Sequence, residues 1–314
     1  MKIKFWGVRG SIPTPLSSNQ IQRKISAVVQ RIQEKDLKSP ETRETFLASL
    51  PENIFGTVGG NTTCVEVRLN DDTMIIFDAG SGLARLGNHL YHKNDFIRNY
   101  HIFFTHFHWD HIQGLPFFSP QVFNPECVIN FYSPVPEFKE ILSGQMKNPY
   151  FPITIDMFSK SINYNVLKNK SIDIGNSKIT WRRMKHPGGS FSYKIEENSK
   201  TVIFSTDTEL QDSDFEKNNN NIQFYKDSDL IILDSQYTLD EAIEKYDWGH
   251  SSYSLAVDFA SAWNINKLVL FHHEPLYDDN KMDSIFKSAN WYKKYQQNSD
   301  IEIILAREDL EISL

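Results

Sequence analysis

A cluster of histidines and an acid stands out in the sequence THFHWDH at residues 105–111. Imidazole nitrogens and carboxylate oxygens are ligands that suit Zn²⁺ and related transition ions. Four donors this close together can serve two ions, one through His106 and His108, the other through Asp110 and His111. Chance produces this pattern too seldom for it to be a surface loop that happens to be rich in histidine. The spacing therefore predicts a metal site.

Three further donors follow later in the chain, each directly after an apolar run. They are His186, Asp207 and His272. Open α/β sheets place ligands at the carboxyl ends of their strands, so a shared site is expected there. Taken singly each is weak, since a lone aspartate at such a place is more often a turn or cap residue. Because all three follow the histidine cluster in sequence, together they supply the remaining ligands for a mononuclear or dinuclear site.

Short runs rich in Ile, Val and Phe, bounded by Gly, Asp, Asn or Pro, predict the strands that carry these donors. Strands are expected at Lys2–Phe5, Cys64–Leu69, Met74–Asp78, His101–Thr105, Val128–Tyr132, Ile179–Arg183, Phe191–Ile195, Val202–Ser205, Leu230–Leu233, Lys267–Phe271 and Ile301–Leu305. Helices are expected at Ile21–Lys35, Leu83–Tyr91, Pro136–Gln145, Leu239–Tyr246, Ser254–Trp263 and Met282–Tyr295. Strands early and late with helices between them favour a layered α/β domain.

The segment Leu16–Phe55 departs from its surroundings, because it is polar and has a helical pattern between two glycine-rich turns. We interpret it as an inserted helical flap within a single domain spanning residues 1–314. Such a flap could cover the site or form a contact in a homodimer. The asparagine run at Lys217–Asn221 predicts a solvated loop tip.

Composition sets limits on the protein class. Apolar residues make up 40% of the chain and charged residues 23%, which excludes wholesale disorder. The net charge of −7 argues against holding a long nucleic acid by bulk charge, so a nucleic-acid partner is not expected. Cys64 and Cys127 make no disulfide framework. No apolar run is long enough for a membrane span or a signal peptide, so a cytoplasmic location is expected.

The order of these motifs resembles the metallo-β-lactamase-fold hydrolases. That superfamily has an early Asp, then T-H-x-H-x-D-H, then His, Asp and His. This chain supplies Asp78, residues 105–111, His186, Asp207 and His272. The resemblance extends from Met1 to about Asp279, apart from the flap. It implies a four-layer αβ/βα sandwich with a dinuclear metal site at one edge.

A finer match is to the phosphodiesterase branch, which includes ribonuclease Z and proteins like the phosphoribosyl cyclic phosphodiesterases. His186 precedes Pro187-Gly188, whereas the histidine follows Pro-Gly in glyoxalase II-like thioesterases. The element at 248–252, WGHSS, resembles the G-H-S-T element of that branch. The opening FWGVRGS at residues 5–11 and the stretch GGNTTC at residues 59–64 look like the corresponding segments of the small cyclic-phosphodiesterase-type members. The stretch from His186 to Asp207 is too short for the exosite arm with which ribonuclease Z holds tRNA, so a small phosphodiester is favoured.

The resemblance also implies residue roles. One ion is held by His106, His108, His186 and Asp207, and the other by Asp110, His111, Asp207 and His272. Zn²⁺ is expected, although Mn²⁺ and Fe²⁺ accept the same ligands. A hydroxide shared by the ions attacks phosphorus, Asp110 orients it or accepts its proton, and His250 protonates the leaving oxygen.

Asp78 and Asp234 are expected to hold ligand imidazoles by hydrogen bonds. The alternatives are a turn residue for Asp78, a buried hydrogen-bonding role for Asp234 and a helix-start residue for His250. His273 is expected to point to the opposite side of its strand from His272. His89, His92 and His101 are read as ordinary histidines.

The sequence indicates the residues that contact the substrate less clearly than it indicates the metal ligands. Trp109 lies within the metal cluster, and Lys147 and Tyr150 lie in a stretch that could stack a base and hold a phosphate. That stretch could equally be a proline-rich loop facing the core. The expected function is a metal-dependent phosphodiesterase acting on a cyclic nucleotide or similar cyclic phosphate. The alternatives are a nuclease on RNA or DNA, a thioesterase or lactonase, and a ligand-sensing module without turnover.

Overall fold

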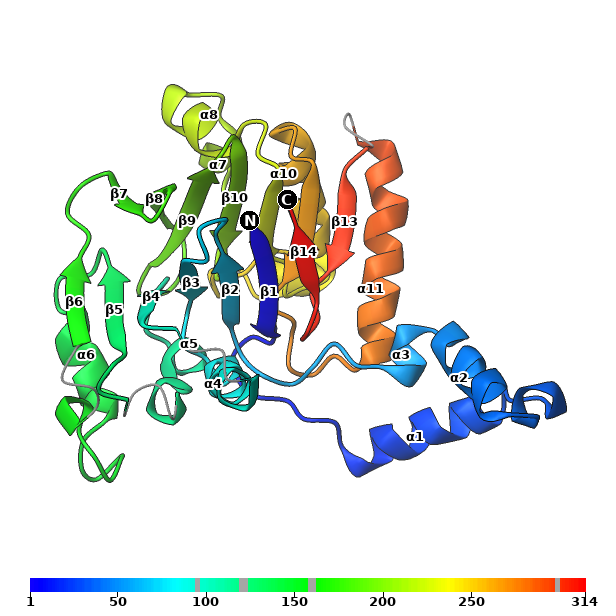
Figure 1. Ribbon diagram of the computed structural model, residues 1–314. Helices are drawn as coiled ribbons and strands as arrows, with labels where there is room; N and C mark the ends of the chain where they lie inside the picture. Colours follow the sequence, from blue (N-terminus) through cyan, green and yellow to red (C-terminus); the bar gives the residue numbers. More distant parts are fainter. Residues whose placement is uncertain (94–96, 119–123, 158–161, 297–299) are drawn as a thin grey trace.

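Two seven-stranded sheets lie face to face with helices on their outer sides in the computed structural model (Figure 1). The structure describes residues 1–93, 97–118, 124–157, 162–296 and 300–314. The strand order is β14-β1-β2-β3-β4-β5-β6 in the first sheet and β13-β12-β11-β10-β9-β8-β7 in the second. This arrangement confirms the expected layered αβ/βα sandwich.

Helices separate some strands in sequence, whereas β2 and β3, and the five strands from β6 to β10, follow one another directly. The first sheet contains β1 (Lys2–Gly7), β2 (Cys64–Arg68), β3 (Met74–Phe77), β4 (Asn99–Phe103), β5 (Val128–Ser133), β6 (Ile162–Val166) and β14 (Glu311–Ser313). The second contains β7 (Ser171–Ile174), β8 (Ser177–Met184), β9 (Ser190–Glu197), β10 (Lys200–Ser205), β11 (Leu230–Asp234), β12 (Lys267–Phe271) and β13 (Glu302–Leu305). The α-helices are α1 (Ser18–Val29), α2 (Pro40–Ser49), α3 (Glu52–Phe55), α4 (Gly82–Lys93), α5 (Trp109–Ile112), α6 (Phe138–Gln145), α7 (Asp212–Phe215), α8 (Asn219–Tyr225), α9 (Leu239–Glu244), α10 (Tyr253–Ala262) and α11 (Asp279–Tyr292).

Alternation along each central strand builds the layers. In β3, Ile75 and Phe77 belong to the core between the sheets, while Met74 and Ile76 belong to the core under the helices. Phe77 stacks on Phe204 of the opposite sheet, with ring centroids 4.9 Å apart. Strands buried on both faces read as continuous apolar runs, which is why the sequence predicts them well.

Three strands were not predicted from the sequence: β6, β7 and β14. The first two end their sheets and are mostly half-buried, and β14 is a short edge strand beside β1. Polar residues fill the solvent side of such strands, so they lack the apolar runs that mark the central strands.

The prediction of a solvated loop tip at Lys217–Asn221 is confirmed only in part, because residues 217–220 are exposed but α8 begins at Asn219. Asn218 caps α8 by accepting a hydrogen bond from the backbone N–H of Asn221. Asn221 is itself buried, and its amide donates to the backbone carbonyls of Ser213 and Glu216. The run is ordered because these side chains satisfy backbone groups at the ends of α7 and α8.

The inserted helical segment expected at Leu16–Phe55, which we call the arm, contains α1, α2 and α3. It projects from one end of the sandwich, where α3 lies against α11 and Lys24 pairs with Asp279 (Figure 1). None of the residues from 11 to 57 is buried. The two ends of the arm meet, since the backbone N–H of Thr14 donates to the carbonyl of Gly60 at 2.7 Å. The arm is thus an insertion between β1 and β2. Treating residues 1–314 as one domain stays a prediction.

Within the described residues, no helix combines the length and the apolar character needed to cross a membrane.

Candidate metal centre

The predicted ligands all follow strands that end at the same edge of the sandwich. The cluster at 105–111 comes after β4, and His186, Asp207 and His272 come after β8, β10 and β12. Because β10, β11 and β12 run parallel, their carboxyl ends lie together. The structure brings the seven predicted ligands into two groups.

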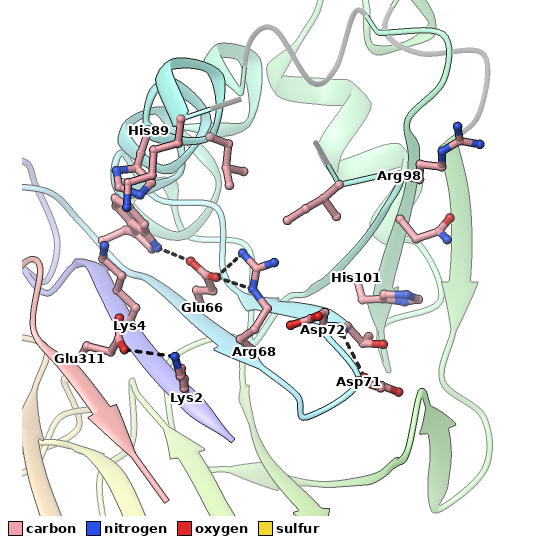
Figure 2. Close-up of a pocket in the computed structure, with 16 residues that line it drawn as sticks. Lys2, Lys4, Glu66, Arg68, Asp71, Asp72, His89, Arg98, His101 and Glu311 are labelled. Carbon is pink, nitrogen blue, oxygen red and sulfur yellow. Dashed lines mark hydrogen bonds and ion pairs between the residues drawn. The ribbon is translucent and has the colours of Figure 1, made fainter. Parts of the chain in front are cut away.

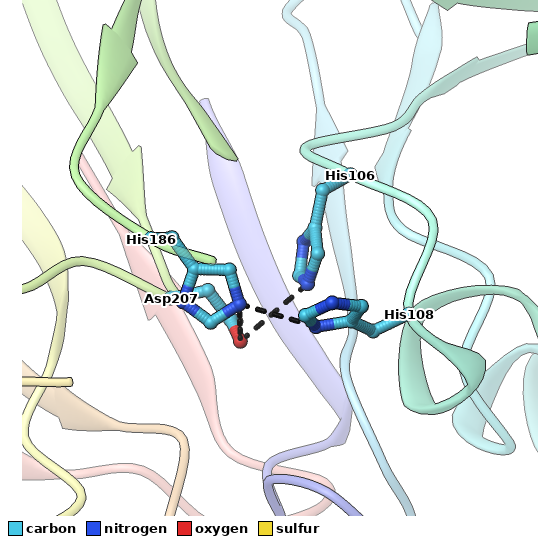
Figure 3. Close-up of side chains that lie close together, drawn as sticks. All are labelled: His106, His108, His186 and Asp207. Carbon is cyan, nitrogen blue, oxygen red and sulfur yellow. Dashed lines mark hydrogen bonds and ion pairs between the residues drawn. The ribbon is translucent and has the colours of Figure 1, made fainter. Parts of the chain in front are cut away.

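The first group contains His106, His108, His186 and Asp207 (Figure 3). His186 Nε2 lies 3.1 Å from His108 Nδ1, and the Nε2 atoms of His106 and His186 each lie 3.7 Å from Asp207 Oδ1. Two donors that share one Zn²⁺ at bond lengths of about 2.1 Å are at most about 4.2 Å apart. These separations therefore suit one ion.

The second group contains Asp110, His111, Asp207 and His272. His111 Nε2 lies 3.1 Å from an oxygen of Asp110 and 3.1 Å from Asp207 Oδ2. His272 Nε2 lies 3.2 Å from the same Asp207 oxygen. Asp207 thus presents Oδ1 to one group and Oδ2 to the other, as a bridging carboxylate must.

The buried donors fit divalent cations. His106 Nε2 and His111 Nε2 are buried with no hydrogen-bond partner, while their Nδ1 atoms already face Thr105 and Asp78. Burial, reinforced by His111, lowers the pKa of His106 far below its usual value, which leaves the neutral imidazole that binds metal. Burial lowers the pKa of His111, but Asp110, Asp207 and Asp78 outweigh it and the pKa rises well above its usual value. A proton on His111 can therefore occupy the place that a divalent ion would take among these carboxylates.

Three groups fix the orientation of the ligand imidazoles. Asp78 accepts from the Thr105 backbone N–H at 2.8 Å and lies 2.9 Å from His111 Nδ1, the kind of contact expected of it. Burial raises the pKa of Asp78. His272 Nδ1 lies 3.0 Å from Gln236 Oε1, and His186 Nδ1 lies 3.0 Å from the carbonyl of Gly249. Such partners set the tautomer and angle of a ligand imidazole.

The turn after β1 is a support that sequence reasoning missed. The backbone N–H of Ser11 donates to Asp110 Oδ2 at 2.8 Å. Gly10 lies against the His272 ring so closely that a Cβ there would be 2.5 Å from Cε1. Arg9 is buried and donates to the carbonyls of Gly59, Glu274 and Tyr277, which holds the turn in place. A backbone N–H does not depend on the residue type, so no sequence motif predicted this role.

The backbone is strained where the site is built. Asp78, Asp207 and His272 adopt φ values of 60°, 51° and 63°. Non-glycine residues adopt this left-handed region seldom and at some cost in free energy, and they concentrate at functional sites. Each follows a strand end, so the positive φ turns its side chain into the centre.

His250 lies beside both groups without belonging to either. Its Nδ1 is 2.8 Å from Asp234 Oδ2, and its ring stacks on His272 with centroids 5.1 Å apart. Burial lowers the pKa of His250, but the Asp234 carboxylate outweighs it and the pKa rises to about 9. Asp234 was expected to hold a ligand imidazole, but its close partner is His250, which is not one of the predicted ligands. Nδ1 of the predicted ligand His272 lies 3.7 Å from Asp234 Oδ2.

The predicted substrate residues lie near this edge but make no contact that assigns them a role. Trp109 sits between two ligands on α5 with its side chain 81% exposed. Lys147 and Tyr150 follow α6 and are exposed, while Met146 of the same stretch is buried in the core. The buried Met146 agrees with a loop that faces the core, and the substrate contacts stay predictions.

A hollow of about 740 Å³ lies elsewhere, on the outer face of the first sheet beside α4 (Figure 2). Lys2, Lys4 and Arg68 line it together with Glu66 and Glu311. It contains none of the predicted ligands, and its charges are of both signs. The hollow is therefore separate from the candidate metal centre. His273 is buried, with Nε2 2.8 Å from the carbonyl of Ala306, and belongs to neither group.

Comparison with known proteins agrees with the fold and the site. Residues 73–273 match the family described as Beta-lactamase superfamily domain. The chain is 27% identical over 236 residues to a protein named ribonuclease Z from Oceanobacillus iheyensis, covering 60% of this chain and 75% of that protein. The metallo-β-lactamase fold protein YhfI of Bacillus subtilis aligns with a TM-score of 0.66 at 16% identity, over 99% of this chain and 98% of YhfI. The short form of human tRNase Z aligns with a TM-score of 0.59 at 18% identity, over 100% of this chain and 99% of that protein.

The chain belongs to the β-lactamase superfamily, as its motifs indicate. The class is that of a metal-dependent hydrolase with the metallo-β-lactamase fold, similar to the phosphodiesterase branch. The expectation that nucleic acid is not a partner, which rested on net charge, is weakened because one relative is named ribonuclease Z.

Proposed function

We propose that this protein is a metal-dependent phosphodiesterase that hydrolyses a small phosphodiester, with a cyclic nucleotide or similar cyclic phosphate as the substrate class. The observation that carries the proposal is the His250–Asp234 pair beside two ligand groups that share Asp207. A paired metal site suits attack on phosphorus, and an adjacent histidine suits protonation of the leaving oxygen.

The two cysteines bear on the location of the protein. Cys64 and Cys127 are buried and form no disulfide, which is consistent with a reducing cytoplasm.

Each residue has a task in this proposal. His106, His108, His186 and Asp207 would hold one divalent ion, and Asp110, His111, Asp207 and His272 the other; Zn²⁺ suits these donors. Divalent ions at such a pair of sites lower the pKa of a water and stabilise negative charge on phosphoryl oxygens.

In this proposal His250 protonates the leaving oxygen. Because Nδ1 faces Asp234, Nε2 is the nitrogen left for proton transfer. The bond from phosphorus to the leaving oxygen breaks as that oxygen takes the His250 proton, and the proton lost by the attacking water restores the histidine through solvent. Asp110, fixed by the Ser11 N–H, is placed to orient the water.

The connection between His186 and Asp207 supports a small substrate. It consists of β9 and β10 joined by a tight turn at Asn198 and Ser199, both with positive φ. An RNA-gripping arm would need an insertion at this place. RNA is the second candidate, favoured by the relative named ribonuclease Z.

The test combines metal analysis with a substrate panel. The purified protein, loaded with Zn²⁺ or Mn²⁺, is assayed with bis-p-nitrophenyl phosphate, cyclic mononucleotides and a tRNA with a 3′ extension. We expect about two ions per chain and hydrolysis of the small diesters that is lost in Asp110→Ala. Preferential cleavage of the tRNA would favour the nuclease.

Other outcomes select the remaining alternatives. Bound metal without phosphodiester turnover would direct attention to thioesters and lactones. A chain that binds no metal would contradict the ligand assignment and favour a ligand-sensing module.

A further inference from the structure

The loop that leads to His250 contacts the predicted ligand His186 through Gly249. The carbonyl oxygen of Gly249 lies 3.0 Å from His186 Nδ1, and the contact is buried. A carbonyl oxygen only accepts hydrogen bonds, so Nδ1 carries the proton and Nε2 keeps the lone pair that a metal ion needs. Gly249 has a φ of 89°, and a Cβ there would lie 2.2 Å from His186 Nδ1. The place of this loop therefore decides how the His186 ring is presented.

Glu209 holds the same loop from the other side. This residue follows the bridging Asp207 by two positions and is only 7% exposed. Its Oε2 accepts a hydrogen bond from the backbone N–H of Gly249 at 3.0 Å, and its Oε1 lies 2.7 Å from Lys185 Nζ. A buried carboxylate is costly unless it is paired and hydrogen-bonded, and both oxygens meet that condition here. Glu209 thus links Gly249 to the segment that carries His186.

Lys185 closes the network around Glu209. It directly precedes His186, and its Nζ also lies 2.6 Å from Asp247 Oδ1 in the loop that leads to His250. The backbone N–H of Glu209 donates to the carbonyl of Lys185 at 3.0 Å. Three segments therefore meet at Glu209: the chain after β8, the chain after β10 and the loop before His250.

We propose that Glu209 is a positioning residue for the metal centre. By holding the Gly249 N–H, it places the Gly249 carbonyl that fixes the tautomer and angle of His186. Its effect falls on the ion site of His106, His108, His186 and Asp207. The inference rests on the proposed function for these ligands, but it does not depend on which substrate is hydrolysed.

The first experiment measures metal binding by Glu209→Gln. A glutamine amide has one accepting oxygen and an NH₂ that only donates, so it cannot satisfy both the Gly249 N–H and Lys185. We expect the affinity for one of the two ions to fall by about 10-fold, as for other groups that orient a ligand. Affinity for the other ion should stay the same. Titration with Co²⁺ in competition with a chromophoric chelator measures both.

The matched control is Glu66→Gln on β2. Glu66 is 6% exposed, and its carboxylate likewise meets one N–H donor and one cation. Its Oε2 accepts from Trp6 Nε1 at 2.9 Å, and its Oε1 lies 3.0 Å from Arg68. It lines the hollow beside α4, which contains none of the predicted ligands (Figure 2). This variant should bind both ions like the wild type, and circular dichroism checks that both variants fold.

A double substitution tests whether Glu209 acts through His186. A His186→Ala chain lacks the ring that the Gly249 carbonyl orients. Adding Glu209→Gln should therefore leave its affinity for the remaining ion unchanged, because the two substitutions remove the same contact. A further loss of affinity would show that Glu209 supports the fold around Asp207 in general, and would overturn the proposal.

A second pair of variants perturbs the loop directly, in case Glu209→Gln does not fold. Gly249→Ala should weaken the same ion because its Cβ would meet His186. Gly188→Ala is the control, since Gly188 has a φ of 80° but an added Cβ has no neighbour within 4 Å. A wild-type chain that binds no metal would overturn this inference and the proposed function together. Binding of both ions as in the wild type by Glu209→Gln or by Gly249→Ala would overturn this inference alone.

Discussion

In the proposed reaction, His250 is the residue that would donate the proton to the leaving group. Asp234 fixes its Nδ1, and the His186 and His272 rings contact its ring, with centroids 5.2 Å and 5.1 Å away. A side chain held on so many sides presents its remaining nitrogen in one direction. That arrangement is typical of a group that must deliver a proton to a defined place.

Replacing His250 by Asn should therefore have an effect that depends on the leaving group. With a cyclic nucleotide, whose leaving alkoxide needs a proton, we expect kcat to fall by about 10²–10⁴-fold. With bis-p-nitrophenyl phosphate, whose leaving group is a weak base, the fall should be much smaller. Steady-state kinetics on both substrates measure this, with bound metal unchanged. Equal losses on the two substrates would exclude a proton-donor role.

Gly10 tests how closely the turn after β1 supports the centre. A Cβ there would lie 2.5 Å from Cε1 of His272, so Gly10→Ala must displace the ring. We expect affinity for metal to fall by about 10–100-fold, as for other changes to groups that position a ligand. Competition with a chromophoric chelator measures it.

The matched control for Gly10 is Gly144→Ala on α6, where an added Cβ has no neighbour within 4 Å. That substitution should leave metal affinity unchanged and stabilise the helix by roughly 0.5–1 kcal/mol. Equal affinity in both variants would show that the turn does not hold His272.

At the scale of elements, strands of different burial differ in how well their sequence predicts them. β3, β4, β10 and β12 are buried on both faces, so their apolar runs are evident, and the ligands at their ends could be located. β7 exposes part of each face and has no such run. In the site, side chains such as Asp78 were predictable from their motifs, whereas the Ser11 N–H and the Gly249 carbonyl are backbone groups that any residue supplies.

Deleting the arm is the prediction that belongs to this scale. Thr14 and Gly60 are hydrogen-bonded, so two glycines can replace Leu16–Phe55 without opening the sandwich. Because no residue of the arm is itself buried, we expect the melting temperature to change by only a few degrees. Lys24 is lost as the partner of Asp279, but water then reaches that carboxylate. Metal content should be unchanged, and loss of folding would show that the arm belongs to the core.

At the scale of the whole molecule, the candidate metal centre draws its residues from both sheets. The first sheet supplies the cluster at 105–111, and the second supplies His186, Asp207 and His272. Between the sheets the contacts are apolar and non-directional, as in the stacking of Phe77 on Phe204. The ligands add directional contacts at one edge, where carboxylates from both sheets, Asp110 and Asp207, approach His111.

Removing the metal should therefore destabilise the whole fold as well as stop hydrolysis. A ligand present at 100 times its dissociation constant stabilises the folded state by about 2.7 kcal/mol, so chelation should lower the melting temperature by roughly 5 °C. Added Zn²⁺ should restore it. His111→Ala, which lacks one ligand, should melt at the lower temperature already and respond little to the chelator. Differential scanning calorimetry with elemental analysis of the same samples makes the comparison. If the metal leaves and the wild-type melting temperature stays the same, the ions do not tie the sheets together, and the strained residues at 207 and 272 must be held by the protein alone.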